Sequence, residues 1–142
     1  MPELRREALL PYPQAAVFDL VNNIERYPEF LPGCVGAEVL EARGTLVRAS
    51  VHARARGFEE TFTTRNTVSA PSRIDLQLED GPFARLSGSW HFKALGDAGC
   101  KVALHLDYEL AGVLGTTLKP LMSKAADRVL EAFVQRAAEQ LG

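Results

Sequence analysis

The sequence predicts an α+β fold, in which a bent antiparallel sheet of about six to seven strands surrounds one long C-terminal helix. Two periodicities lead to this prediction. Apolar residues recur at every second position from 35 to 110, and at steps of three or four from 117 to 141. The sheet would expose a whole apolar face if the long helix did not cover it. Because a bent sheet and a rod do not fill space completely, we expect a cavity between them.

The first 24 residues predict a strand followed by a short helix. Residues 4–10 read as the strand, which Pro11-Tyr12-Pro13 ends. A helix is expected over residues 14–24, since Phe18 and Val21 recur at helical spacing and Pro13 suits a position in the first turn.

Residues 27–34 form the most unusual segment of the chain. Pro28 and Pro32 each fix φ and remove a backbone donor, so we expect neither a regular helix nor a strand here. Each proline also favours extended geometry in the residue before it. Phe30 and Leu31 are therefore held on a stiff loop, where they either fill the core or line a cavity.

Alternation is clearest over residues 47–56, where alanine and valine occupy one face and polar residues occupy the other. This pattern is typical of a half-buried antiparallel strand. Further strands are expected over residues 59–68, 74–79, 86–93 and 101–110, with turns at 80–83 and 96–99. Together with the N-terminal strand they complete the predicted sheet.

The last block predicts an amphipathic helix over residues 117–141. Thr116 or Thr117 can cap its start. Pro120 is tolerable only in the first turn, because proline lacks the N–H that a helix interior needs.

Composition restricts the class of protein. A length of 142 residues suits one domain spanning 1–142, and a net charge of −2 argues against a general phosphate-backbone binder. Cys34 and Cys100 are too few for a disulfide framework and are expected to be reduced thiols in a cytoplasmic protein. We expect no signal peptide and no membrane span, so any contact with the inner membrane would be peripheral.

The sequence predicts neither a catalytic set nor a metal site. His52, His91 and His105 all alternate onto the polar face, and no cluster has the spacing of metal ligands. Glu29 and Asp80 lie in loops at the rim of the expected cavity and are the only candidate acids, each more in keeping with a solvated side chain. We therefore expect a protein that is not an enzyme.

The polar face of residues 47–56 carries Arg48, Arg54 and Arg56. This basic face could contact RNA or an anionic membrane surface. The favoured interpretation is a solvated sheet face, in which these arginines pair across strands with the acidic residues Glu59, Asp75 and Glu79.

The large apolar side chains are expected to converge on one interior. Plain core packing would explain any one of them, but small residues such as Ala49, Gly88 and Ala125 are interspersed and leave volume unfilled. Trp90 and Met122 are adaptable surfaces for a flat apolar ligand.

Several motifs together resemble one known family. They are Tyr27-Pro28-Glu29-Phe30-Leu31-Pro32-Gly33-Cys34, Thr61-Phe62-Thr63-Thr64-Arg65-Asn66, Asp80-Gly81-Pro82-Phe83, Leu86-Ser87-Gly88 and Trp90-His91-Phe92. They resemble the coenzyme Q-binding protein family, which includes bacterial ribosome association toxins and belongs to the START-like (helix-grip) superfamily of polyketide cyclases, dehydrases and lipid transporters. The resemblance covers residues 9–137, and Lys119-Pro120 departs from the family's pattern.

The resemblance implies a hydrophobic tunnel that takes ubiquinone or a similar lipid. The implied ligand-binding residues are Phe30, Leu31, Pro32, Phe62, Phe83, Trp90, Leu118, Met122, Ala125 and Val129. The first expected function is a non-enzymatic quinone chaperone that supports cellular respiration. The alternative is a toxin, as in toxin–antitoxin systems, that binds the large ribosomal subunit and blocks subunit joining. An enzyme acting on a polyketide-like ligand ranks last, since alternation places no titratable group in the cavity.

Overall fold

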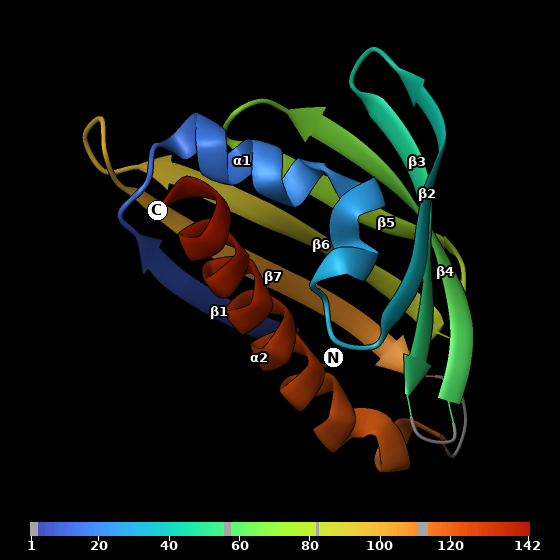
Figure 1. The fold of residues 1–142 in the computed structure, drawn as a ribbon. Helices are drawn as coiled ribbons and strands as arrows, with labels where there is room; N and C mark the ends of the chain where they lie inside the picture. The colour runs from blue at the N-terminus through green and yellow to red at the C-terminus, as the bar shows by residue number, and fades with distance from the viewer. Residues whose placement is uncertain (1–2, 56–57, 82, 111–113) are drawn as a thin grey trace.

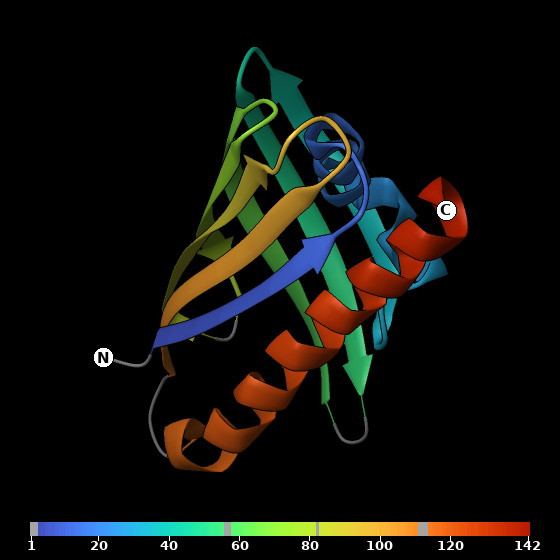
Figure 2. The same cartoon turned by 90° about the vertical axis from the view of Figure 1, so that its left-hand side faces the viewer.

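The computed structural model describes residues 3–55, 58–81, 83–110 and 114–142, with side chains at all of these positions except 55, 58, 83, 84, 110 and 114–123. Figures 1 and 2 show one curved sheet with every helix on the same face. The opposite face of the sheet is open to solvent. This two-layer arrangement is the predicted one.

The chain contributes seven strands, as the alternation predicts. They are β1 (Glu3–Leu10), β2 (Cys34–Arg43), β3 (Leu46–Ala55), β4 (Phe58–Ser69), β5 (Arg73–Asp80), β6 (Phe83–Ala94) and β7 (Cys100–Leu110). The helices are α1 (Gln14–Asn22), the 3₁₀ helix η1 (Ile24–Glu29) and α2 (Leu114–Leu141).

The strands follow the order β1-β7-β6-β5-β4-β3-β2, and every neighbouring pair is antiparallel. From β2 to β7 each strand therefore pairs with the next one along the chain, while β1 closes the sheet beside β7. Register places Val51 opposite Phe62 and Leu76 opposite Gly88 on the helix-facing side. We call this side the concave face.

The outer face of β3 is a paired face rather than a free basic one. Nε of Arg48 donates to Glu79 at 2.6 Å, and Arg54 lies 3.5 Å from Glu59. These contacts confirm the predicted pairing with Glu59 and Glu79. Asp75 instead pairs with Arg73 on its own strand, at 2.8 Å, and Arg56 lies outside the described residues.

Two local expectations are wrong. The segment that begins at Tyr27 is not irregular throughout, because η1 continues to Glu29 and contains Pro28; the tighter 3₁₀ turn accepts a proline that an α-helix interior disfavours. The long helix begins at Leu114 rather than 117. Thr116 and Thr117 therefore lie within the helix rather than before its first residue, and Pro120 lies beyond its first turn.

The helices cover the concave face unevenly. α2 packs against β1, β7 and α1, while α1 packs against β6 and β7 and η1 packs against β2. The Gln14 amide donates to the carbonyl of Phe92 at 2.7 Å, which fixes α1 to the sheet. Arg6 of β1 pairs with Asp127 of α2. The main cover therefore lies over the β1 side and the α1 end of the sheet.

Phe133 of α2 joins these layers. Its ring centroid lies 5.3 Å from those of Phe30 and Trp90 and 5.4 Å from that of Tyr27, in edge-to-face contacts. Phe92 stacks on Trp90 at 6.4 Å. Only 3% of Phe133 is exposed. One helical side chain thus holds β6 and the segment after α1 together.

We expect Phe133→Ala to reduce the free energy of unfolding by about 3–5 kcal/mol, because it removes the ring that three aromatic neighbours contact. Urea denaturation followed by circular dichroism measures the loss. Gln135→Ala, at an exposed position of the same helix, is the control and should change stability little. A loss below about 1 kcal/mol for Phe133→Ala would contradict the role given to this ring.

Candidate functional site on the concave face

The α1 end of the concave face is filled by side chains. Trp90 is only 6% exposed, and Phe30 and Leu31 pack against the same buried core. The Tyr27 hydroxyl donates to the carbonyl of Val21, and burial is the main cause that raises the pKa of Tyr27, with Cys34 nearby as a lesser one. At the α1 end of the concave face, the predicted ligand-binding residues Phe30 and Trp90 are therefore part of a packed cluster.

The other end of the concave face is less completely covered. Most inward-facing apolar side chains there are only partly buried, although their neighbours nearer to α1 are buried; Tyr108, opposite Leu86, is the exception at 2% exposure. The partly buried set is Val51, Phe62, Leu76, Leu78, Leu86 and Leu106. The buried set is Ile74, Trp90, Phe92, Val102 and Leu104. An apolar surface therefore stays partly open toward the end of β5 and the start of β6.

At this same end β5 and β6 separate. They pair from Arg73 opposite His91 to Gln77 opposite Ser87 and not beyond, while β5 continues along β4 and β6 starts along β7. A pocket of about 330 Å³ lies where they part. It is lined by Gln77, Leu78, Glu79, Asp80, Gly81, Arg85 and Leu86. The sheet is thus open beside its partly exposed apolar residues.

Gly81 connects this pocket to the predicted residue Phe62. A Cβ atom added at Gly81 would lie 3.1 Å from a methyl carbon of Leu78 and 3.3 Å from the ring of Phe62. Any larger residue would press on both side chains. The Asp80-Gly81 turn therefore sits directly against the apolar floor of the concave face.

Two charged residues that line this pocket, Glu79 and Arg85, are paired with residues outside it. The Arg85 guanidinium donates to Asp107 at 3.0 Å, which holds the pKa of that carboxyl below its usual value. The hydrogen bond from Arg48 likewise lowers the pKa of Glu79. Ionised, paired carboxylates of this kind are poorly suited to proton transfer at neutral pH.

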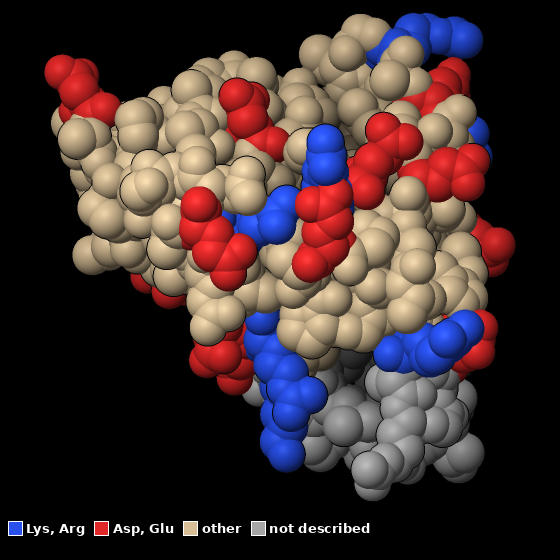
Figure 3. Space-filling model, viewed as in Figure 1, with Lys and Arg blue, Asp and Glu red and all other residues tan. Residues whose placement is uncertain are grey.

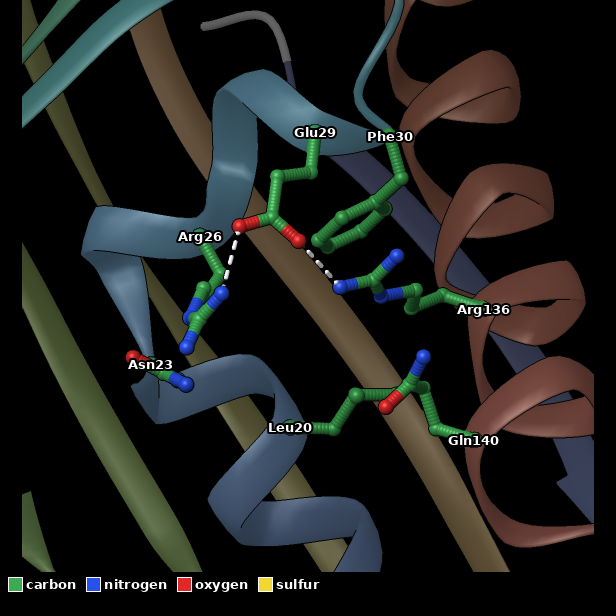
Figure 4. A pocket seen from close by; sticks show the side chains of 7 residues that line it. All are labelled: Leu20, Asn23, Arg26, Glu29, Phe30, Arg136 and Gln140. Atoms are coloured by element: carbon green, nitrogen blue, oxygen red, sulfur yellow. Dashed lines mark hydrogen bonds and ion pairs between the residues drawn. The ribbon is translucent and has the colours of Figure 1, made fainter.

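A second pocket, of about 350 Å³, lies between α1, η1 and the end of α2. Figure 4 shows Glu29 between two arginines: Arg26 donates to one carboxylate oxygen at 2.8 Å, and Arg136 donates to the other at 2.6 Å. The Arg136 guanidinium also lies 5.0 Å from the ring centroid of Phe30. These contacts fix the segment after η1 to α2, a role for Arg136 that the helical pattern alone did not predict.

Glu29 was one of two candidate acids at the cavity rim, and its surroundings favour the charged form. Hydrogen bonds from Arg26 and then Arg136 lower its pKa. The side chain is also exposed, so it remains ionised near neutral pH. Asp80 is exposed too and lines the pocket between β5 and β6.

The remaining predicted ligand-binding residues divide into three groups. Phe62 and Val129 are partly buried, while Pro32 is exposed. Ala125 is also exposed, which corrects the expectation that it faces the interior: the stripe that α2 buries runs through Ala126, Leu130, Phe133 and Ala137. The side chains of Phe83, Leu118 and Met122 lie outside the described residues.

The histidines lie on the outer face, as alternation predicts. His52 contacts Thr61 at 2.8 Å and Glu59 at 2.9 Å. His91 lies 2.8 Å from the Ser89 hydroxyl, and its ring centroid is 4.9 Å from that of His105. Among the described residues no group of three or more His, Cys, Asp or Glu could hold a metal ion. No helix within the described part of the chain is long and apolar enough to cross a bilayer.

We expect Arg136→Met to raise the pKa of Glu29, because one of its two guanidinium partners is lost. Carbon-detected NMR titration of the carboxyl measures this change. The ion pairs contribute stability above the unfolded-state pKa of Glu29, and this contribution is lost as pH falls through the lowered folded-state value. Arg128→Met, at an exposed position of α2, is the control. An unchanged pKa in Arg136→Met would contradict the bridge.

Comparison of the sequence with known proteins identifies a family and several relatives. The family model described as polyketide cyclase / dehydrase and lipid transport matches residues 10–134. A ribosome association toxin from Pseudomonas aeruginosa is 46% identical over 140 residues, covering 98% of this chain and 97% of that protein. A mitochondrial coenzyme Q-binding protein from Schizosaccharomyces pombe is 28% identical, covering 94% and 85%.

The fold is that of START-like proteins. The crystal structure of an aromatase/cyclase from Streptomyces sp. R1128 matches with a TM-score of 0.91 over 99% of this chain and 96% of that one, at 16% identity, a likeness that concerns the fold alone. The helix-grip prediction is thereby confirmed. The chain belongs to the polyketide cyclase / dehydrase and lipid transport family, and the proteins to which it is similar include a ribosome association toxin and a coenzyme Q-binding protein.

Proposed function

We propose that the protein binds ubiquinone or a similar apolar molecule on the concave face, as a carrier that performs no chemistry on it. The observation that carries this proposal is the partial exposure of inward-facing apolar side chains beside the opening between β5 and β6. Such side chains gain free energy when a ligand covers them, at about 25 cal/mol for each Å² removed from water. A flat ring with an isoprenoid tail has the surface to do this.

The charged groups around this surface support a binding role rather than a catalytic one. Glu79 and Asp107, on the outer face near the opening between β5 and β6, are each hydrogen-bonded to an arginine that favours the ionised form. The relatives described above carry the names of a toxin and a coenzyme Q-binding protein. The aromatase/cyclase resembles this chain in fold only, at 16% identity.

We expect Phe62→Lys to reduce quinone loading roughly tenfold or more, because an ammonium group on the apolar floor would lose hydration when the ligand covers it. Organic extraction of purified protein and mass spectrometry measure the loading. Phe62 is only partly buried, so the variant should fold. Thr61→Lys places the same charge one residue earlier, on the outer face, and should load normally. Equal loading in both variants, or no quinone in the wild type, would contradict the proposal.

Association with the large ribosomal subunit is the second candidate, favoured by the ribosome association toxin that is 46% identical to this chain. Figure 3 shows acidic and basic side chains interspersed on the helix-bearing face. On the outer face Arg48 lies directly opposite Arg65 in the register of β3 and β4. Arg48 is already paired with Glu79 and Glu41, so RNA binding here would exchange these carboxylates for phosphates. The outer face is the surface that we assign to this candidate.

The two candidates make separable predictions. If the outer face binds ribosomal RNA, the double variant Arg48→Glu and Arg65→Glu should lose co-sedimentation with the large subunit, and wild-type binding should weaken steeply with salt. Arg43→Glu, at the exposed end of β2, is the control for charge alone. If the amount of protein that co-sediments changes neither with the charge reversals nor with salt, the outer face is not the ribosome-binding surface. Phe62→Lys should leave sedimentation unchanged.

A further inference from the structure

One polar side chain stands among the apolar residues of the concave face. Asn66 belongs to β4, where Phe62, Thr64 and Val68 share its side of the strand. Register places it opposite Val47 of β3 and Leu76 of β5. Its side chain is therefore part of the surface that faces the helices.

Asn66 is buried and incompletely hydrogen-bonded. Only 3% of the residue is exposed, and its carbonyl oxygen Oδ1 has no hydrogen-bond partner among the residues that the structure describes. Buried polar groups in folded proteins are almost always paired, and an unpaired acceptor destabilises the fold. Packing does not account for an amide at this position, since a leucine of similar size would fill it without an unpaired oxygen.

The surroundings of Asn66 place it at the border of the open part of the concave face. Its cross-strand neighbours Val47 and Leu76 are only partly buried. Beyond Leu76 the same row continues to Gly88, which brings no side chain and leaves room that a methyl group of Leu106 fills. Leu78, two residues after Leu76 on the same strand, lines the pocket where β5 and β6 part. Because only 3% of Asn66 is exposed, a ligand on this floor reaches Oδ1 only if Val47 or Leu76 moves aside.

We propose that Asn66 anchors the ligand by accepting a hydrogen bond from one of its hydroxyl groups. This inference rests on the proposed apolar-ligand function and narrows the ligand class to apolar molecules with a hydroxyl group, such as a phenol or a hydroquinone with an alkyl tail. Of the two redox forms of ubiquinone, only the reduced hydroquinone has a proton to donate to Oδ1, so the oxidised quinone would bind without this hydrogen bond. The hydroxyl satisfies Oδ1, and the tail covers the partly exposed floor. The same molecule with its hydroxyl methylated has no proton to donate and leaves the oxygen unpaired.

The test is a cycle of two probes and two proteins. The probes are 4-nonylphenol and 4-nonylanisole, which share a tail and differ in the hydroxyl. Binding is followed by the emission of Trp90, the single tryptophan of the chain, excited where the probes absorb little. The ratio of the anisole Kd to the phenol Kd should fall roughly 3- to 10-fold in Asn66→Leu relative to the wild type, the range expected for one hydrogen bond.

Two further measurements separate anchoring from a structural role. Thr67→Val, at the next position on the outer face of β4, should leave the ratio unchanged. Empty Asn66→Leu should melt at or above the wild-type Tm, since it removes an unpaired buried acceptor. Should Asn66→Leu not fold, Asn66→Thr, with a side chain suited to a strand, is measured in the same cycle.

Each outcome is decisive. A lowered ratio with an unchanged or raised Tm supports the anchor. If both probes bind but the ratio is the same in wild type and variant, the anchor is wrong while the apolar-ligand function stands. If neither probe binds the wild type, the anchor and the proposed function both fail. A variant that folds only with a strongly lowered Tm shows that Asn66 supports the empty fold, and this too overturns the inference.

Discussion

The structure depends on one constraint: a wide curved sheet must hide an apolar face, and only a small helical layer is present to hide it. α2 lies over β1 and β7, α1 over β6 and β7, and η1 over β2. These elements meet in the aromatic cluster around Phe133, where edge-to-face rings fill the space. Because the cover is concentrated at this end, the apolar residues toward the separation of β5 and β6 stay partly exposed.

This division has a consequence for function. A site that stays open in the absence of ligand must be supported by contacts elsewhere, since exposed apolar surface contributes nothing to folding. Here the support comes from the Phe133 cluster and from Glu29, which links η1 to α2 through Arg136. The polar pocket beside Glu29 therefore belongs to the structural end of the molecule, although it is slightly larger than the pocket between β5 and β6.

Alternation in the sequence predicted a sheet of about six to seven strands and the apolar side of the strands where it is clearest, because period two is a local property of a strand. Other features depend on contacts between distant segments and were not predictable in this way. The exposure of Ala125 depends on which face α2 turns toward the sheet. The pairing of Arg136 with Glu29 joins residues 107 positions apart. Of the predicted ligand residues, Phe30 and Trp90 proved to be close together, but in the packed cluster.

Asn66 illustrates why the sequence pattern could not single out every residue of the site. Alternation assigns it to the apolar side of β4, and asparagine there resembles an ordinary exception to the pattern. Only the structure shows that its oxygen is buried and has no hydrogen-bond partner within the described part of the chain. With asparagine at this position the ligand-free fold is less stable than it would be with an apolar residue of similar shape. The simplest physical reason is that the unpaired acceptor is satisfied in the bound state, so that the same atom that weakens the empty fold contributes to recognition.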